Sequence, residues 1–105
     1  MAGKTDPREE GQVLTKKKPK LQQPRLYKVL LHNDDYTPME FVVAVLQQIF
    51  HLDEVDATKI MLHVHNNGVG VAGVFTYEIA ETKVQTVMAA AQTHEYPLQC
   101  SMEPE

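Results

Sequence analysis

The stretch that decides the fold is Asn33-Asp34-Asp35-Tyr36-Thr37-Pro38-Met39-Glu40-Phe41, at the boundary between an apolar strand and a helix. Thr37 and Glu40 have the Thr-x-x-Glu spacing of a capping box, in which each side chain satisfies a free backbone N–H at the helix start. Pro38 suits the first helical position, because its fixed φ fits a helix and its missing N–H is not needed there. The sequence therefore predicts that a helix starts here, with an amide and two carboxylates directly before it.

Further strands and helices are predicted on either side of this boundary. Residues 26–32 are rich in strand-favouring side chains, and an amphipathic helix follows from residue 38 to about residue 51. Asp53 is a second candidate N-cap, and Asn66-Asn67-Gly68 ends the helix that it starts. A strand over 69–75, a helix capped by Thr76 and a half-buried strand over 98–103 complete the chain, and the glycines of the second strand indicate a bulge or a close backbone approach. We expect a single small α+β domain of order β-α-α-β-α-β, with three helices packed on a three-stranded antiparallel sheet.

The net charge of −4 is the sum of a basic N-terminal segment and an acidic remainder of the chain. Residues 1–25 hold seven lysines and arginines against three acids, whereas residues 26–105 hold three lysines against eleven acids. The first segment also has three prolines and few large apolar side chains, too few to offset the entropy of ordering. We therefore predict a flexible, disordered basic extension over residues 1–25 and a folded domain over residues 26–105.

Neither a membrane segment nor a secretory signal is visible in the sequence. The longest apolar run, residues 41–46, is far shorter than the roughly 20 residues that span a bilayer, and charges and prolines occupy the N-terminus. The single cysteine, Cys100, can form no internal disulfide and is expected to be a buried structural thiol. We expect a cytoplasmic protein that does not bind membranes.

No motif of a known catalytic or metal centre is present in the sequence. Glycine loops for nucleotides, a nucleophile elbow and a His-Glu-x-x-His zinc motif are all missing. His63 and His65 lie about 200° apart around a helix, so they cannot share a metal ion, and His65 shares a face with Met61. Asp34 and Asp35 lack the spacing of a calcium loop. Because the lysine run of the basic extension has no interleaved aromatic residues, we expect no nucleic-acid partner, and we expect no metal or cofactor.

The acidic loop and His65 each have an ordinary structural explanation. Asp34 and Asp35 could simply favour the positive end of the helix, and a histidine on an apolar helix face is commonly a core residue. Taken together with Met39 and Met61, however, these acceptors beside an apolar hollow suit a ligand that joins a cationic amine to a hydrophobic side chain. A free protein N-terminus is such a ligand, because its α-amino group is mostly charged at pH 7 and needs several acceptors when it is desolvated.

Four segments of the sequence resemble ClpS, the bacterial N-end rule adaptor of the ClpA–ClpP protease. They are the stretch quoted above with Val42 added, Met61-Leu62-His63-Val64-His65, Gly73-Val74-Phe75-Thr76 and Glu81-Thr82-Lys83-Val84. The likeness covers residues 26 to about 102. It implies an adaptor that binds substrates beginning with Leu, Phe, Tyr or Trp, called N-degrons, and delivers them to the ClpA unfoldase of ClpAP for degradation. It also implies a monomer that is not an enzyme.

The resemblance assigns the two halves of a ligand site. Asn33, the Asp34-Asp35 pair and His65 match positions that hold the α-amino group and the adjacent backbone, and which aspartate faces the ligand stays open. Met39 matches a gate that disfavours the β-branched residues Val and Ile. Positions in or around the side-chain pocket are matched by Leu31, Thr37, Met39, Val42, Val43, Met61, Val64 and Leu98.

The resemblance also implies a surface for the partner, and two alternatives remain beside it. Glu78 and Lys83 match positions that dock the N-terminal domain of ClpA, and the basic extension matches a variable segment that takes part in delivery. One alternative partner is another Clp-type unfoldase, such as ClpC. The other alternative is a small hydrolase that uses Asp34 or Asp35 with His65, although no nucleophile can be identified for it.

Overall fold

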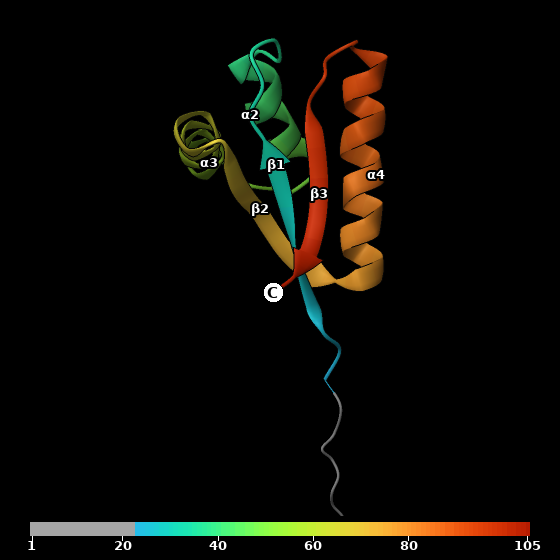
Figure 1. The fold of residues 1–105 in the computed structure, drawn as a ribbon. Coiled ribbons are helices and arrows are strands. Elements are labelled where there is room, and N and C mark those ends of the chain that lie inside the picture. Colours follow the sequence, from blue (N-terminus) through green and yellow to red (C-terminus); the bar gives the residue numbers. More distant parts are fainter. Residues whose placement is uncertain (1–22) are drawn as a thin grey trace, which may run out of the picture.

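The computed structural model describes residues 23–105, so nearly all of the predicted flexible extension lies outside the described residues. Six elements follow one another in the order that the sequence predicts (Figure 1). They are β1 (Leu26–His32), α2 (Met39–Gln48), α3 (Glu54–Asn67), β2 (Val69–Thr76), α4 (Tyr77–Thr93) and β3 (Gln99–Pro104). The predicted order β-α-α-β-α-β is confirmed.

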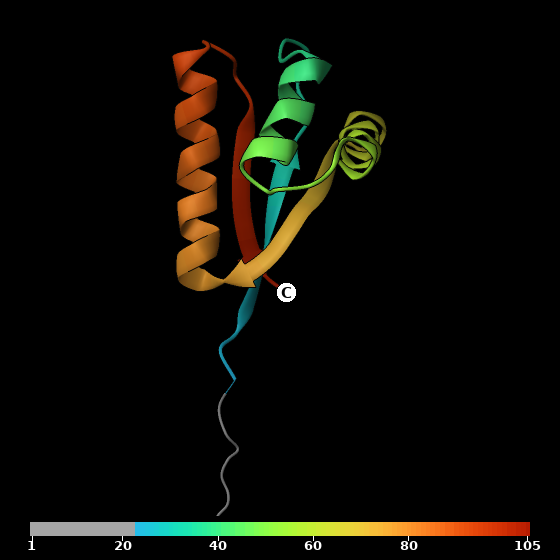
Figure 2. The same cartoon turned by 180° about the vertical axis from the view of Figure 1, so that it is seen from behind.

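The three strands form one antiparallel sheet of order β2-β1-β3, with β1 in the centre. In Figure 1 α2 passes behind this sheet, and in Figure 2, seen from the back, it passes in front. The sheet face toward the helices is apolar, since Val29, Leu31 and Cys100 are all buried there. The opposite face carries Lys28 and Ser101, which are half-buried. The helices therefore cover one face of the sheet, and the predicted α+β class is confirmed.

Two glycines of β2 allow neighbouring side chains to lie close to the strand backbone, as the sequence predicts. Val29 pairs with Gly73 whereas Leu30 pairs with Val71, so the register of β1 and β2 shifts by one residue at a bulge. A Cβ at Gly73 would lie 2.6 Å from the Phe75 ring. A Cβ at Gly70 would lie 2.7 Å from the side chain of Val64 in α3. Any larger residue at either position would force its neighbours apart.

The ends of α3 follow from local sequence. The Asp53 carboxylate accepts a hydrogen bond of 2.8 Å from the backbone N–H of Asp56, which confirms the predicted N-cap. At the other end Gly68 adopts the left-handed conformation, with φ of 89°, and its N–H donates to the carbonyl of Val64. This turn leads directly into β2. The position of α3 is thereby fixed relative to the sheet.

The prediction for α2 is wrong at both ends. The helix starts at Met39 with Pro38 as its N-cap, and no side chain caps it, so the predicted Thr37–Glu40 capping box does not form. It ends at Gln48 rather than near residue 51, because His51 takes a left-handed conformation with φ of 60°. Thr76 does precede α4 as its N-cap residue, but its side chain makes no capping hydrogen bond.

The single cysteine lies in the core, as the sequence predicts. Cys100 is buried, and burial raises the pKa of its thiol to about 12, so the thiol is protonated at neutral pH. It is therefore an inert core group, as predicted. Within residues 23–105 no helix has the length and apolar character needed to cross a membrane.

Candidate functional site

A cavity of about 260 Å³ opens where the loop after β1 meets the start of α2 and the middle of α3. One end of its lining is polar and consists of loop residues together with a histidine of α3. The other end is apolar and consists of methionines and valines. The lining comprises Asn33, Asp34, Asp35, Thr37, Met39, Val42, Met61, Val64 and His65. All four residues that the sequence analysis assigned to amine binding therefore meet in one cavity with five of those assigned to the side-chain pocket.

Asp34 organises the loop that forms the polar end. One oxygen of its carboxylate accepts hydrogen bonds from the backbone N–H groups of Tyr36 and Thr37, at 2.8 and 2.7 Å. The other oxygen accepts a hydrogen bond of 2.8 Å from the Thr37 hydroxyl. Burial alone would raise the pKa of Asp34, but the hydrogen bonds from Thr37 and Tyr36 outweigh it and lower this pKa below its ordinary value of 3.8. Thr37 thus stabilises the loop by donating hydrogen bonds to Asp34, and it does not cap the helix.

This role of Asp34 was not predicted from the sequence, although a signal for it is present there. An aspartate followed three residues later by a threonine is typical of a loop in which the carboxylate binds nearby backbone N–H groups. Asp35, in contrast, is exposed. The two neighbouring carboxylates therefore differ. Asp34 is hydrogen-bonded within its own loop, whereas Asp35 is accessible to a ligand.

A backbone hydrogen bond joins the two polar parts of the cavity. The N–H of Asn33 donates to the carbonyl of Gly68, the residue that ends α3, at 2.9 Å. This bond ties the end of β1 to the end of α3, near His65. His65 is exposed and lies in the cavity lining with Met61, as the helical spacing predicts. His65 is consequently not a core residue.

Three residues assigned to the side-chain pocket do not line this cavity. Leu31 is completely buried in the core. Leu98 lines a very small cavity that adjoins the main one, since the two share Asn33, Asp34, Thr37, Val42 and Val64. Val43 lines a separate groove between α2 and α3. These residues support or adjoin the cavity instead of forming its wall.

The described residues contain no metal centre. No group of three or more His, Cys, Asp or Glu side chains in residues 23–105 is arranged to hold a metal ion. His63 is exposed outside the cavity, and its ring nitrogen lies 3.2 Å from the amide nitrogen of Asn67. The carboxylate, amide and imidazole groups of the cavity lining can accept hydrogen bonds from a ligand.

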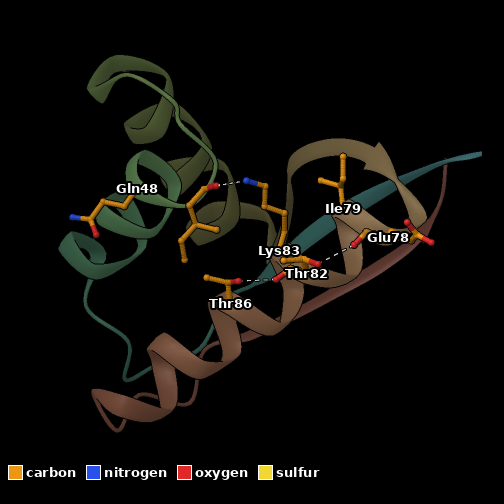
Figure 3. A pocket seen from close by; sticks show the side chains of 7 residues that line it. Gln48, Glu78, Ile79, Thr82, Lys83 and Thr86 are labelled. Carbon is orange, nitrogen blue, oxygen red and sulfur yellow. Dashed lines mark hydrogen bonds between the residues drawn. The ribbon is translucent and has the colours of Figure 1, made fainter.

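A second hollow of about 460 Å³ lies between the end of α2 and α4, on elements distant in sequence from the first loop. Figure 3 shows Lys83 reaching from α4 to the end of α2, where its Nζ donates to the Ile49 carbonyl at 2.6 Å. The same ammonium lies 5.8 and 5.6 Å from the ring centroids of Phe50 and Phe75. Glu78 is exposed and directed away from Lys83. The hollow between α2 and α4 is lined by Gln48, Ile49, Glu78, Ile79, Thr82, Lys83 and Thr86.

Comparison with known proteins identifies the family to which the chain belongs. A family model described as ATP-dependent Clp protease adaptor protein ClpS matches residues 22–101. The chain belongs to the ClpS family. As a ClpS family member it is an adaptor of the ATP-dependent Clp protease and not itself an enzyme. The hydrolase alternative is therefore set aside.

Relatives with the ClpS name cover most of the chain. The ClpS of Myxococcus xanthus is 69% identical over 88 residues, which are 84% of this chain and 82% of the relative. The ClpS of Caulobacter vibrioides is 64% identical over 91 residues, which are 87% of this chain and 84% of the relative. Among solved structures, Agrobacterium tumefaciens ClpS2 bound to L-phenylalaninamide matches with a TM-score of 0.77 and 41% identity, over 79% of this chain and 100% of that chain.

Proposed function

We propose that the chain binds proteins whose first residue is Leu, Phe, Tyr or Trp and delivers them to the ClpA unfoldase of ClpAP for degradation. The observation that carries this proposal is the division of one cavity into an acceptor-rich end and an apolar end. A protein N-terminus has the matching division, because its charged α-amino group and its first side chain leave the same carbon atom. Few other parts of a protein combine these two features.

In this proposal the amine is held by Asn33, Asp35 and His65. The Asp34 carboxylate already accepts three hydrogen bonds from its own loop, so its task is to shape the loop. Asp35 is exposed and supplies the negative charge for the ammonium. A neutral His65 ring can accept a further hydrogen bond through one nitrogen, and Asn33 can accept one through its amide oxygen.

The first side chain of the substrate enters the apolar end of the cavity. Val42, Met61 and Val64 are buried or nearly so, and Met39 is 43% exposed at the mouth. A methionine at the mouth can adapt to flat aromatic rings and to leucine, while a side chain branched at Cβ needs room close to the backbone. Burial of such a side chain contributes about 1.5–3 kcal/mol, and each charge-assisted hydrogen bond a similar amount, before the cost of association. Both halves are needed for useful affinity.

The ligand of the structural relative supports this proposal. The Agrobacterium ClpS2 structure contains L-phenylalaninamide, which has a free α-amino group beside a benzyl side chain. Its amide stands where the next residue of a protein would follow. The chemistry of that ligand fits the two ends of the cavity described here.

Fluorescence anisotropy with labelled peptides tests the binding proposal. Peptides that begin with Leu, Phe, Tyr or Trp should bind, peptides that begin with Ile or Val should bind weakly, and an N-acetylated Leu peptide should not bind. Acetylation removes the positive charge and two donor hydrogens but leaves the side chain unchanged. Equal binding of the acetylated and free Leu peptides would refute the proposal.

We propose further that the hollow between α2 and α4 docks the N-terminal domain of ClpA. Glu78 is exposed and forms no ion pair with another described residue, whereas the Lys83 ammonium is hydrogen-bonded to the end of α2. Ile79 lies beside Glu78 and is 50% exposed, so the surface offers an apolar group next to a carboxylate. Such a combination is suited to a protein partner.

Degradation assays separate docking from substrate binding. With ClpA, ClpP and ATP, the variant Glu78→Ala should slow degradation of a folded substrate with an N-terminal Leu but should leave Leu-peptide affinity unchanged. Glu81→Ala, an exposed acid one turn further along α4, is the matched control. Unchanged degradation by the Glu78 variant would contradict the docking site, and activation of ClpC instead of ClpA would favour the alternative partner.

The basic segment 1–25 belongs to the delivery step in this proposal. A chain that lacks residues 1–22, which are most of this segment, should bind Leu peptides with the affinity of the full chain but deliver them more slowly to ClpA. If this shortened chain delivered substrates at the full rate, the segment would have no part in delivery.

A further inference from the structure

Gly70 lies near the start of β2, the strand that follows directly after α3 (Figure 1). It pairs with Leu31, whose side chain is completely buried on the sheet face toward the helices. A side chain at residue 70 would point to the same face, because residues directly opposite each other in paired strands share a face of the sheet. Residue 70 therefore faces α3, where His63 and Val64 lie nearest to it.

The space around Gly70, and not its backbone, excludes a side chain at this position. Among the described glycines Gly68 alone has a positive φ, so the φ of Gly70 is one that alanine adopts without strain. A Cβ at Gly70, however, would lie 2.7 Å from Cγ2 of Val64 and 3.2 Å from Cδ2 of His63. Carbon atoms in favourable contact are about 3.5–4.0 Å apart, so a Cβ at residue 70 would force Val64 to move.

Val64 connects Gly70 to the ligand cavity. Its side chain is 3% exposed, faces Gly70 and also lines both the ligand cavity and the very small cavity that adjoins it. A valine in a helix strongly prefers one rotamer, so its methyl group does not turn aside freely. Because protein interiors are close-packed, a displaced group moves into adjoining empty space. A side chain at residue 70 would therefore move Val64 into the space that receives the first side chain of a substrate.

We propose that Gly70 is a specificity-determining residue, which keeps the ligand cavity wide enough for aromatic first residues by leaving room for Val64. This inference rests on the proposed function, because it concerns the apolar end of the same cavity. Gly70 itself contacts no substrate in this proposal and acts by positioning Val64. The upper size limit of the first residue is then set in β2, outside the cavity lining.

Fluorescence anisotropy with labelled peptides that begin with Leu, Phe or Trp tests this role on the full chain and on Gly70→Ala. The ratio of the Trp-peptide affinity to the Leu-peptide affinity should fall about four- to tenfold in the variant, the factor that one methyl group gives in an apolar pocket. The Phe peptide should lose affinity to an intermediate degree. A general effect on folding or on amine binding would lower all three affinities by the same factor and leave the ratio unchanged.

Gly73→Ala is the matched control, because it makes the same change in the same strand and also meets a close neighbour. A Cβ at Gly73 would lie 2.6 Å from the ring of Phe75, which lines neither of the two cavities. This control should keep the Trp-to-Leu ratio of the full chain within about twofold, as expected for a distant site. If the ratio for Gly70→Ala equals or exceeds that of the control, the proposal is overturned.

A second pair of variants shows whether Gly70 acts through Val64. Val64→Ala removes the methyl group that a Cβ at residue 70 would meet, so adding Gly70→Ala to it should change the ratio by less than about twofold. An equal fall in both backgrounds would overturn the proposal. If Gly70→Ala alone does not fold, recovery of folding and of Trp-peptide binding in the double variant supports the role, and a lack of recovery overturns it.

The same peptides separate this inference from the proposed function. If the full chain binds none of the three peptides, the proposed function itself is refuted. If the full chain binds all three and Gly70→Ala leaves their ratio unchanged, the inference about Gly70 fails alone.

Discussion

The cavity between the loop after β1, α2 and α3 and the hollow between α2 and α4 each contain two acidic or basic side chains with different interactions. In the cavity, Asp34 accepts three hydrogen bonds from its own loop, while its neighbour Asp35 is exposed. In the hollow, Lys83 donates to the end of α2, while Glu78 points away from it and is exposed. In both regions one charge is hydrogen-bonded within the fold and the other is exposed, so in the proposed function the exposed charge is the one that contacts a partner. A substitution that abolishes function can therefore act through shape or through contact, and only measurements of folding and binding together separate the two.

The largest effect is expected at the free charge of the cavity. Asp35→Asn should weaken binding of a Leu peptide about 10- to 100-fold, because one charge-assisted hydrogen bond contributes about 1.5–3 kcal/mol. The free energy of unfolding, measured by urea titration, should change by less than about 0.5 kcal/mol, as for an ordinary surface residue. A loss of stability without a loss of affinity would reverse the roles that we assign to the two aspartates.

A smaller effect, on stability, is expected at Lys83. Lys83→Met keeps the length of the side chain but removes the hydrogen bond to Ile49 and the contact of the ammonium with Phe50 and Phe75. We expect the free energy of unfolding to fall by about 1–2 kcal/mol, with peptide affinity unchanged. Lys59→Met, an exposed lysine of α3, is the matched control. If stability stays at the control value while delivery to ClpA is lost, Lys83 acts by contact.

Asp34 should show a pH-dependent effect on stability. Asn at this position can still accept both backbone hydrogen bonds but has no second acceptor oxygen for the Thr37 hydroxyl, so Asp34→Asn should cost about 1 kcal/mol at pH 7. The pKa of Asp34 is lower in the folded state than its ordinary value of 3.8, so its contribution is complete above that value and is lost as the pH falls through the folded pKa. Urea titrations between pH 7 and pH 3 should show the two proteins converging below about pH 4. A difference that is constant with pH would exclude the charge of Asp34 as the cause.

The smallest effect is expected at the cavity histidine. His65→Ala removes a ring nitrogen that can accept one hydrogen bond from the ammonium. Affinity for a Leu peptide at pH 7 should fall about threefold to tenfold, because one such hydrogen bond contributes about 0.5–1.5 kcal/mol. An unchanged affinity of this variant would remove His65 from amine binding.

Much of the fold follows from residues that are close together in the sequence. The Asp53 cap, the Gly68 turn and the small residues of β2 act over a few positions, and each prediction made from them is confirmed. The start of α2 was misjudged because two local patterns compete for Thr37. Its hydroxyl can cap the helix or donate to Asp34, and the folded loop uses the second option.

The sequence by itself determined the order of the elements, the acidic loop before α2, and the presence of His65 and Met61 on one face of a helix. These features depend on side-chain spacing, which is fixed before the chain folds. Only the tertiary structure decided which aspartate is free, that Lys83 bonds to a carbonyl 34 residues away, and that Val43 lines a groove separate from the ligand cavity. Those facts depend on distances between segments remote in the sequence, and such distances exist only once the helices have packed on the sheet.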